Sequence, residues 1–193
     1  GAKANIFGDG FDKDYITEII NGCNTNILFA TDDIYMNIDE SVKKSKNKEV
    51  ILMSLAESLP NKQNPYIEIE KEWYDFKDRT LEIKENNARI TLSRDFLSLG
   101  KNYKGNYIEK VDLNDEFTIT YSSGSTNSKR PKAIVHDVKS YIVMGIYHDP
   151  EVSNVPSMKN LRMLSHIPTH SNTNIMSCIT DPLMQGSEIA VEP

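Results

Sequence analysis

The sequence has few cysteines, no long hydrophobic run and no excess of positive charge. Its two cysteines, Cys23 and Cys178, form no Cys-x-x-Cys pair, so we expect a reduced, cytoplasmic protein in which both thiols are buried. No apolar run approaches the roughly 20 residues that cross a bilayer, so we expect no membrane span. The 22 basic and 28 acidic residues give a net charge of −6. This balance argues against nucleic acid as the main partner.

A chain of 193 residues with 38% hydrophobic residues can form a globular domain with its own core. Residues 1–55 alternate short apolar runs with amphipathic segments, and no internal repeat is present. Apolar strands separated by helices are typical of a parallel sheet covered on both faces. The sequence therefore predicts an α/β fold of three layers, with a mostly parallel sheet flanked by helices. In this part we expect strands near 2–7, 26–30 and 50–55, and helices near 13–21 and 32–42.

Residues 56–110 form an irregular, charged segment. We place a helix within 70–85, and we expect Ser93 to cap a short helix that ends at Gly100 and buries Phe96, Leu97 and Leu99. The pattern then becomes regular again over 117–193, where Pro182 should kink or end a helix. We therefore expect residues 1–193 to form a single α/β domain, which is incomplete because the alternation continues to the last residue. The later elements are expected at 117–121 (strand), 138–148 (helix), 161–167 (strand), 175–184 (helix) and 188–191 (strand).

The loop after strand 117–121 is the most informative segment. It reads Tyr-Ser-Ser-Gly-Ser-Thr over residues 121–126, and the basic residues Lys129, Arg130 and Lys132 follow. Small residues let backbone N–H groups converge on phosphate oxygens, hydroxyl groups add donors, and lysine supplies a mobile positive charge. The loop therefore has the composition of a phosphate-binding loop, and Lys129 and Arg130 add charge at its tip or lie there in solvent.

A flexible surface turn rich in Ser and Thr is the alternative interpretation of this loop. The flanking residues favour a phosphate site, because Asp137 is placed to cap the next helix. That helix has an apolar face at helical spacing, so the loop would be held between two packed elements. The residues of this face are Val138, Tyr141, Ile142 and Gly145.

The loop is not a Walker A loop, because Lys132 lies between Pro131 and Ala133 and not in a Gly-Lys-Ser/Thr sequence. Residues 121–126 and Pro131-Lys132 resemble the signature Tyr-Ser/Thr-Ser-Gly-Ser-Thr-Gly-x-Pro-Lys-Gly of the adenylate-forming (AMP-binding) superfamily. This superfamily includes acyl-CoA synthetases, aryl-CoA ligases, luciferases and the adenylation domains of peptide synthetases. The chain departs from the signature between Thr126 and Pro131, where it is two residues longer and lacks a glycine, and at Ala133, which replaces the last glycine.

Other segments resemble the same superfamily more weakly. Residues 111–115 are similar to its acidic lead-in, and residues 164–170 are similar to its strand that ends in Pro-x-x-His, although His170 comes one residue early. The superfamily's Tyr-Gly-x-Thr-Glu segment, its Ser/Thr-Gly-Asp segment and its late catalytic lysine have no counterpart in the sequence. The resemblance therefore implies a fragment of the large N-terminal domain that is inactive alone.

The resemblance implies an AMP-forming acid–thiol ligase. In this superfamily a carboxylate attacks the α-phosphorus of ATP with the help of magnesium, and the acyl group then passes to coenzyme A or to phosphopantetheine on a carrier protein. The substrate would be a small carboxylic acid, and His170 would belong to its acyl pocket. By the same resemblance, the phosphates of ATP would be held by Ser122, Ser123, Gly124, Ser125, Thr126 and Lys132.

Two other functions stay open at this point. One is a non-catalytic module that binds a nucleotide or a carrier protein, which the altered loop tip favours. The other is a flavodoxin-like domain whose loop binds a flavin phosphate, although the loop comes late in the sheet for that fold. A metal site is not expected, because His166 and His170 lie in a strand and a Pro-containing turn and not on one face of a helix.

Overall fold

The computed structural model describes residues 2–23, 26–45, 49–54, 80–84, 89–105, 109–122, 130–153 and 161–191. The chain divides into two compact units. We call Asp9–Gly105 the parallel unit, and we call Gly1–Gly8 together with Asn106–Pro193 the hairpin unit. No helix in the described ranges is long and apolar enough to cross a membrane.

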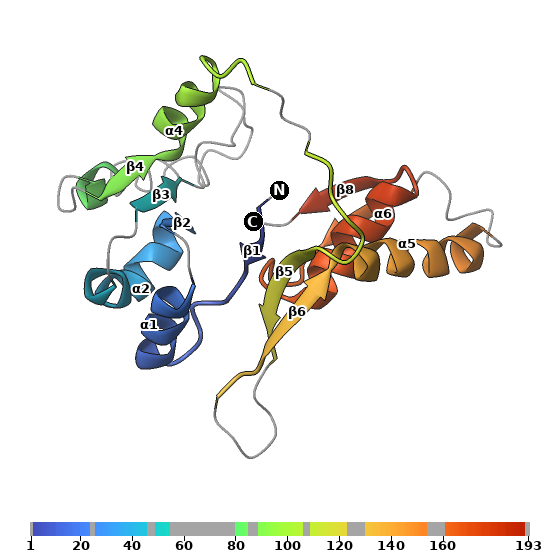
Figure 1. Ribbon diagram of the computed structural model, residues 1–193, viewed down its shortest axis with the longest axis horizontal. Helices are drawn as coiled ribbons and strands as arrows, with labels where there is room; N and C mark the ends of the chain where they lie inside the picture. Colours follow the sequence, from blue (N-terminus) through green and yellow to red (C-terminus); the bar gives the residue numbers. More distant parts are fainter. Residues whose placement is uncertain are drawn as a thin grey trace, which may run out of the picture. The chain divides into compact units, whose positions relative to one another are not determined.

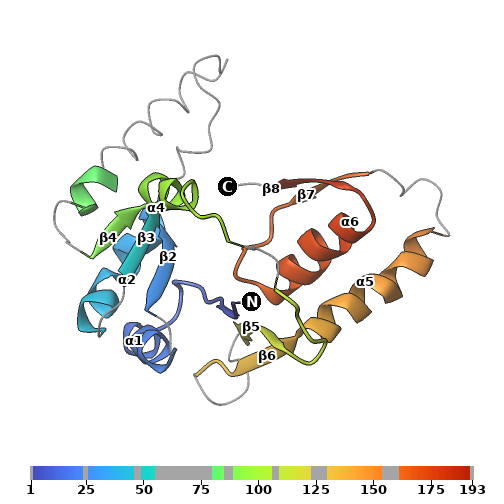
Figure 2. The same cartoon turned by 45° about the horizontal axis from the view of Figure 1, so that its top comes forward.

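The parallel unit is a small sheet covered by helices. Its strands pair in the order β2-β3-β4, and both pairings are parallel. In Figures 1 and 2 these strands lie between α4 on one side and α1 and α2 on the other. Its helices and strands are α1 (Lys13–Gly22), β2 (Ile27–Thr31), α2 (Asp32–Lys44), β3 (Glu49–Met53), β4 (Ile90–Leu92) and α4 (Ser93–Gly100).

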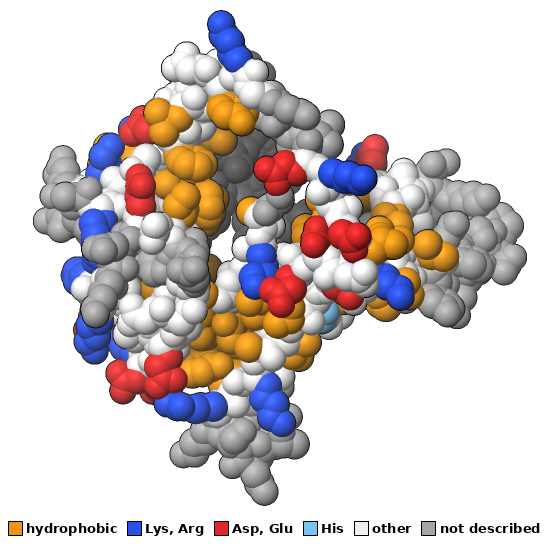
Figure 3. Space-filling view, in the orientation of Figure 1, with side chains coloured by type: hydrophobic (Ala, Val, Ile, Leu, Met, Phe, Trp, Pro, Cys, Tyr) orange, Lys and Arg blue, Asp and Glu red, His pale blue; other side chains and the backbone are white. Residues whose placement is uncertain are grey.

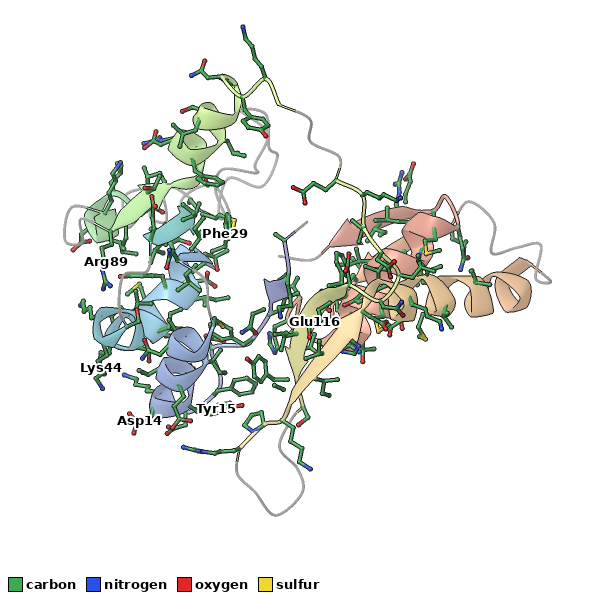
Figure 4. The ribbon with its side chains drawn as sticks, viewed as in Figure 1. Asp14, Tyr15, Phe29, Lys44, Arg89 and Glu116 are labelled. Atoms are coloured by element: carbon green, nitrogen blue, oxygen red, sulfur yellow. The ribbon has the colours of Figure 1, made fainter. Side chains whose placement is uncertain are left out.

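Burial on both faces explains why the central strand of this unit is an unbroken apolar run. Val50, Ile51 and Leu52 of β3 are all fully buried, as expected for a parallel strand with helices on both sides. The C-terminal end of α2 has carbonyl groups without partners inside the helix. The Val42 carbonyl oxygen accepts from the backbone N–H of the C-cap residue Ser45 (3.0 Å). Arg89, which Figure 4 labels, also donates to the carbonyl oxygens of Val42 (3.0 Å) and Ser45 (3.2 Å).

The hairpin unit contains two sheets. β1 pairs with β5 in parallel and β5 pairs with β6 in antiparallel fashion, while β7 and β8 form a separate parallel pair. Among the strands that the structure describes, β5 and β6 are the one antiparallel pair. The elements are β1 (Ala4–Asn5), β5 (Glu116–Tyr121), β6 (Ala133–Asp137), α5 (Val138–Ser153), β7 (Arg162–Ser165), the π-helix η3 (Asn174–Thr180), α6 (Asp181–Met184) and β8 (Glu188–Val191).

The α/β class and the parallel pairing that the sequence predicts are confirmed. The structure also forms the predicted strands and helices within a few residues of their expected ends. The helix expected over 175–184 is a π-helix that continues directly into α6, and Pro182 lies in the first turn of α6. The helix expected within 70–85 falls mostly outside the described residues, although 80–84 are helical.

Two predictions for α4 are wrong. Leu92, at the end of β4, takes the N-cap position without a side-chain hydrogen bond, and Ser93 is the first helical residue. Leu97 and Leu99 are 70% and 66% exposed, because α4 contacts the sheet through another side chain. Phe96 packs edge-on against Phe29 of β2, with their ring centroids 5.7 Å apart.

The two thiols are less buried than the sequence predicts. Cys23 and Cys178 are both half-buried, and no disulfide joins them. Cys23 takes the C-cap position of α1, just after the last helical turn, and Cys178 belongs to η3. Neither residue lies in a central strand, where burial is most complete.

Candidate phosphate-binding site

The predicted phosphate loop connects β5 to β6, so it is the tip of a hairpin. The backbone N–H of Ser122 donates to the carbonyl oxygen of Lys132 (3.0 Å), and the backbone N–H of Lys132 donates to the Ser122 Oγ (2.9 Å). These two hydrogen bonds continue the β5–β6 ladder beyond the Tyr121↔Ala133 pair. They hold the two ends of the loop together at its base.

The structure places two of the six predicted phosphate-binding residues, Ser122 and Lys132, side by side. The other four, Ser123, Gly124, Ser125 and Thr126, lie outside the described residues, as does Lys129. The Ser122 hydroxyl accepts a hydrogen bond from the Lys132 backbone, so its oxygen closes the loop while its hydrogen stays available to donate.

Positive charge gathers at this end of the hairpin. Arg130 and Lys132 are exposed or nearly so, and Figure 3 shows Lys and Arg side chains at the end of the β5–β6 hairpin. Among the residues that the structure describes, no carboxylate lies within ion-pair distance of the Lys132 ammonium group. An anion could therefore bind here without displacing an acidic side chain of those residues.

The helix that follows the hairpin begins with the cap that the sequence predicts. Asp137 Oδ1 accepts hydrogen bonds from the backbone N–H of Ser140 (2.8 Å) and from its hydroxyl group (2.5 Å). The hydrogen bonds from the Ser140 side chain and backbone lower the pKa of Asp137 below its ordinary 3.8, so the cap stays ionised at neutral pH. The start of α5 is also fixed by the Val138 N–H, which donates to the Asp115 carbonyl oxygen (3.1 Å).

Two hydroxyl groups of β5 are buried, and each is hydrogen-bonded. Thr118 and Thr120 are 3% and 1% exposed. The Thr118 hydroxyl is hydrogen-bonded to the Tyr141 hydroxyl of α5 (2.7 Å), and the Thr120 hydroxyl is hydrogen-bonded to His136 Nε2 of β6 (3.1 Å). The buried hydroxyl groups of β5 are thus satisfied by one partner on the helix and one on the neighbouring strand.

His170 lies at the same end of the β1-β5-β6 sheet as the candidate phosphate loop, which begins where β5 ends. β1 runs parallel to β5 with Asn5 opposite Ile119, so Gly8 and Ser122 follow the same ends of two neighbouring strands. The exposed His170 ring packs on Gly8 so closely that a Cβ atom built there would lie 2.8 Å from Nε2. The structure therefore brings both predicted functional segments to one end of the β1-β5-β6 sheet.

Strand β6, which positions Lys132, is not among the strands predicted from the sequence. The signal was present in the β-branched pair Ile134-Val135 just after Pro131, because β-branched residues favour strands. In the described part of the chain, no group of three or more His, Cys, Asp or Glu residues could hold a metal ion.

No family model and no curated protein matches the sequence. Solved structures do match it in fold. The adenylation domain of carboxylic acid reductase from Segniliparus rugosus, solved with AMP and a co-purified carboxylic acid, matches 98% of this chain with a TM-score of 0.68 and 10% identity. The corresponding domain from Mycobacterium chelonae matches 98% with a TM-score of 0.61 and 13% identity. A luciferase-like enzyme from the mealworm Zophobas morio matches 100% with a TM-score of 0.56 and 14% identity.

These similarities show the fold of the chain. It is the fold of part of the N-terminal domain of adenylate-forming enzymes. The matched region covers 29%, 27% and 37% of the three proteins' own chains. The chain therefore spans about a third of the length of the structures that it matches.

Proposed function

We propose that this chain, which has the fold of part of an adenylation domain, binds the phosphates of ATP at its β5–β6 hairpin and belongs to an AMP-forming acid–thiol ligase. The observation that carries the proposal is the pair of hydrogen bonds between Ser122 and Lys132. They close the base of a loop with the composition of a phosphate site, and they fix the backbone of a lysine there. The AMP bound to the matching domain from Segniliparus rugosus supports a nucleotide as the ligand.

In this proposal the chain's own residues hold and neutralise the phosphates. ATP, when bound, supplies the electrophilic phosphorus and a pyrophosphate leaving group. The Lys132 ammonium group offsets negative charge on the β- and γ-phosphates, while Ser122 keeps the loop closed and residues 123–126 offer small side chains and backbone donors. The superfamily resemblance implies that magnesium would accompany the ATP, where it would offset phosphate charge.

The acid would bind at the same end of the sheet. His170 packs on Gly8, beyond the strand that neighbours β5, so we assign it to a pocket for a small carboxylic acid. The co-purified acid in the matching reductase domain supports this substrate class. The acceptor would be coenzyme A or a phosphopantetheine group on a carrier protein.

A second candidate is a module that binds phosphates without catalysis. The observation in its favour is the altered loop, which lacks the signature's glycine between Thr126 and Pro131 and has Ala133 in place of its last glycine. Both candidates require phosphate binding at the hairpin, but they differ in acid-dependent exchange of pyrophosphate into ATP. Exchange by a longer protein that contains this chain would support the ligase, and binding without exchange would support the module. The flavodoxin-like alternative predicts a yellow protein, and the fold similarity favours adenylation domains over it.

The role of Lys132 is tested by titrating the chain with pyrophosphate in a calorimeter. Lys132→Ala should weaken binding by about tenfold or more, because hydrogen bonds to charged groups contribute about 1.5–3 kcal/mol. The matched control is Lys139→Ala, which removes an exposed lysine of the same unit on α5 and should change the affinity less than about twofold. Equal affinities of the parent and the Lys132→Ala variant would refute the proposal.

A further inference from the structure

Strand β6 is held in place less firmly than the strand beside it. Among the strands that the structure describes the order is β1-β5-β6, so β6 lies at the edge of this sheet and pairs with β5. The ladder between β5 and β6 also contains an irregularity between Glu116 and Thr118, where the register shifts. Backbone pairing alone therefore allows more than one alignment of β6 against β5.

The observed register decides what stands at the base of the loop. Thr118 pairs with His136 and Thr120 pairs with Ile134, and the next pair in this alternation is Ser122 with Lys132. Residues two apart on a strand share a face. A slip of β6 by one residue would turn both Lys132 and His136 to the opposite face and would remove the lysine from its place beside Ser122.

One side-chain contact depends on the face that His136 takes in this register. His136 stands opposite Thr118, but the Thr118 hydroxyl already bonds to Tyr141. The imidazole instead reaches diagonally to Thr120, one step nearer the loop, with 3.1 Å between His136 Nε2 and the hydroxyl oxygen. The ring also packs edge-on against Tyr141, with centroids 6.1 Å apart. A slip of one residue would turn His136 to the opposite face and break this contact.

We propose that His136 is a positioning residue that locks the register of the β5–β6 hairpin and so holds Lys132 at the base of the phosphate loop. This role rests on the proposed function of the hairpin as a phosphate site. His136 lies four residues from Lys132 along β6, so it acts through the strand and not through contact with the ligand. The tautomer of the ring decides whether Thr120 or His136 donates the hydrogen bond.

The test compares two substitutions of His136 by pyrophosphate titration. His136→Leu keeps the bulk of the side chain but removes the hydrogen bond, and it should weaken binding by about fivefold, as the loss of one hydrogen bond allows. His136→Gln keeps a hydrogen-bonding group at similar reach and should restore binding to within about twofold of the parent. Parent-like affinity in His136→Leu, or failure of His136→Gln to rescue, would overturn the proposal.

Tyr141→Phe separates positioning from simple stabilisation. It removes the other buried hydrogen bond of this face, the one to Thr118, which lies further from the loop. We expect Tyr141→Phe to lower the melting temperature as much as His136→Leu does, with a much smaller loss of pyrophosphate affinity. Equal losses of affinity in the two variants would show that His136 acts through stability alone.

The register itself can be measured without any ligand. Cross-strand nuclear Overhauser effects between Ile119 and Val135 report the native pairing. In His136→Leu we expect these signals to weaken and those of a shifted pairing to appear, whereas an intact native register would overturn the lock. If the parent protein fails to bind pyrophosphate, the proposed function fails, and this measurement still decides whether His136 sets the register.

Discussion

Gly8 and Gly10 lie two residues apart, but only Gly8 has another side chain packed on it. A Cβ atom at Gly8 would lie 2.8 to 3.0 Å from three atoms of the His170 ring, whereas nothing lies within 4 Å of the same position at Gly10. The close approach thus requires the absence of a side chain at Gly8. No local sequence pattern distinguishes the two glycines, because the contact is made by a residue from the other end of the chain.

Gly8→Ala should displace the His170 ring, since the added methyl group would overlap it. The imidazole proton resonances of His170 report this displacement in an NMR spectrum. Gly10→Ala is the matched control and should leave those resonances unchanged. Identical His170 signals in the parent and in Gly8→Ala would mean that the ring does not pack on Gly8.

Helix caps show how far single residues can be predicted. Asp137 was predicted to cap α5 and does so, because its carboxylate is within reach of the Ser140 N–H. Ser93 has an equally suitable side chain, but it is not the cap of α4, because the preceding strand β4 ends at Leu92 and puts that residue in the cap position. A cap can therefore be predicted only when the element before it is known.

At the scale of elements, the sequence predicts the longer strands and helices and misses two short strands. β4 has three residues, Ile90–Leu92, which is too short for an alternating pattern to be recognised, and its pairing with β3 makes it a strand. β6 (Ala133–Asp137) is not among the predicted strands, since a helix normally follows each strand of a parallel α/β fold and the next element expected after 117–121 was the helix 138–148. The hairpin is the exception to that alternation, and it carries the candidate site.

The cap of α5 should depend on pH in one direction. The Ser140 hydrogen bonds lower the pKa of Asp137 below 3.8 in the folded protein, so the stability that they contribute is present at neutral pH. This stability is lost only as the pH falls below 3.8, and the loss is complete once the pH is below the lowered pKa of Asp137. The destabilisation caused by Asp137→Ala should therefore be constant from pH 7 to 5 and should shrink at lower pH, as measured by urea unfolding.

Ser140→Ala provides the control for this cap. It removes the hydroxyl donor, which is the largest cause of the lowered pKa, so the pKa of Asp137 should rise toward 3.8 in a carbon-13 titration of its carboxyl group. An unchanged titration curve would mean that the Ser140 hydroxyl does not bond to Asp137.

At the scale of the whole molecule, the sequence predicts the order of elements better than their pairing. Alternating apolar runs give the α/β class, but they do not show that β1 joins β5, at a distance of more than one hundred residues along the chain. This pairing includes an ion pair between Lys3 and Glu116, and Figure 4 labels the latter. It places Gly8 and the candidate phosphate loop at one end of a sheet, while Asp9–Gly105 forms a separate compact unit.

We propose that phosphates bind at the end of the β5–β6 hairpin. The most direct test is an NMR titration of the isotope-labelled chain with pyrophosphate, in which each backbone amide reports on its own surroundings. We predict shifts at Ser122, Lys132 and the residues between them, with the amides of the parallel unit unchanged. Shifts confined to the parallel unit, or none at all at saturating pyrophosphate, would contradict the account.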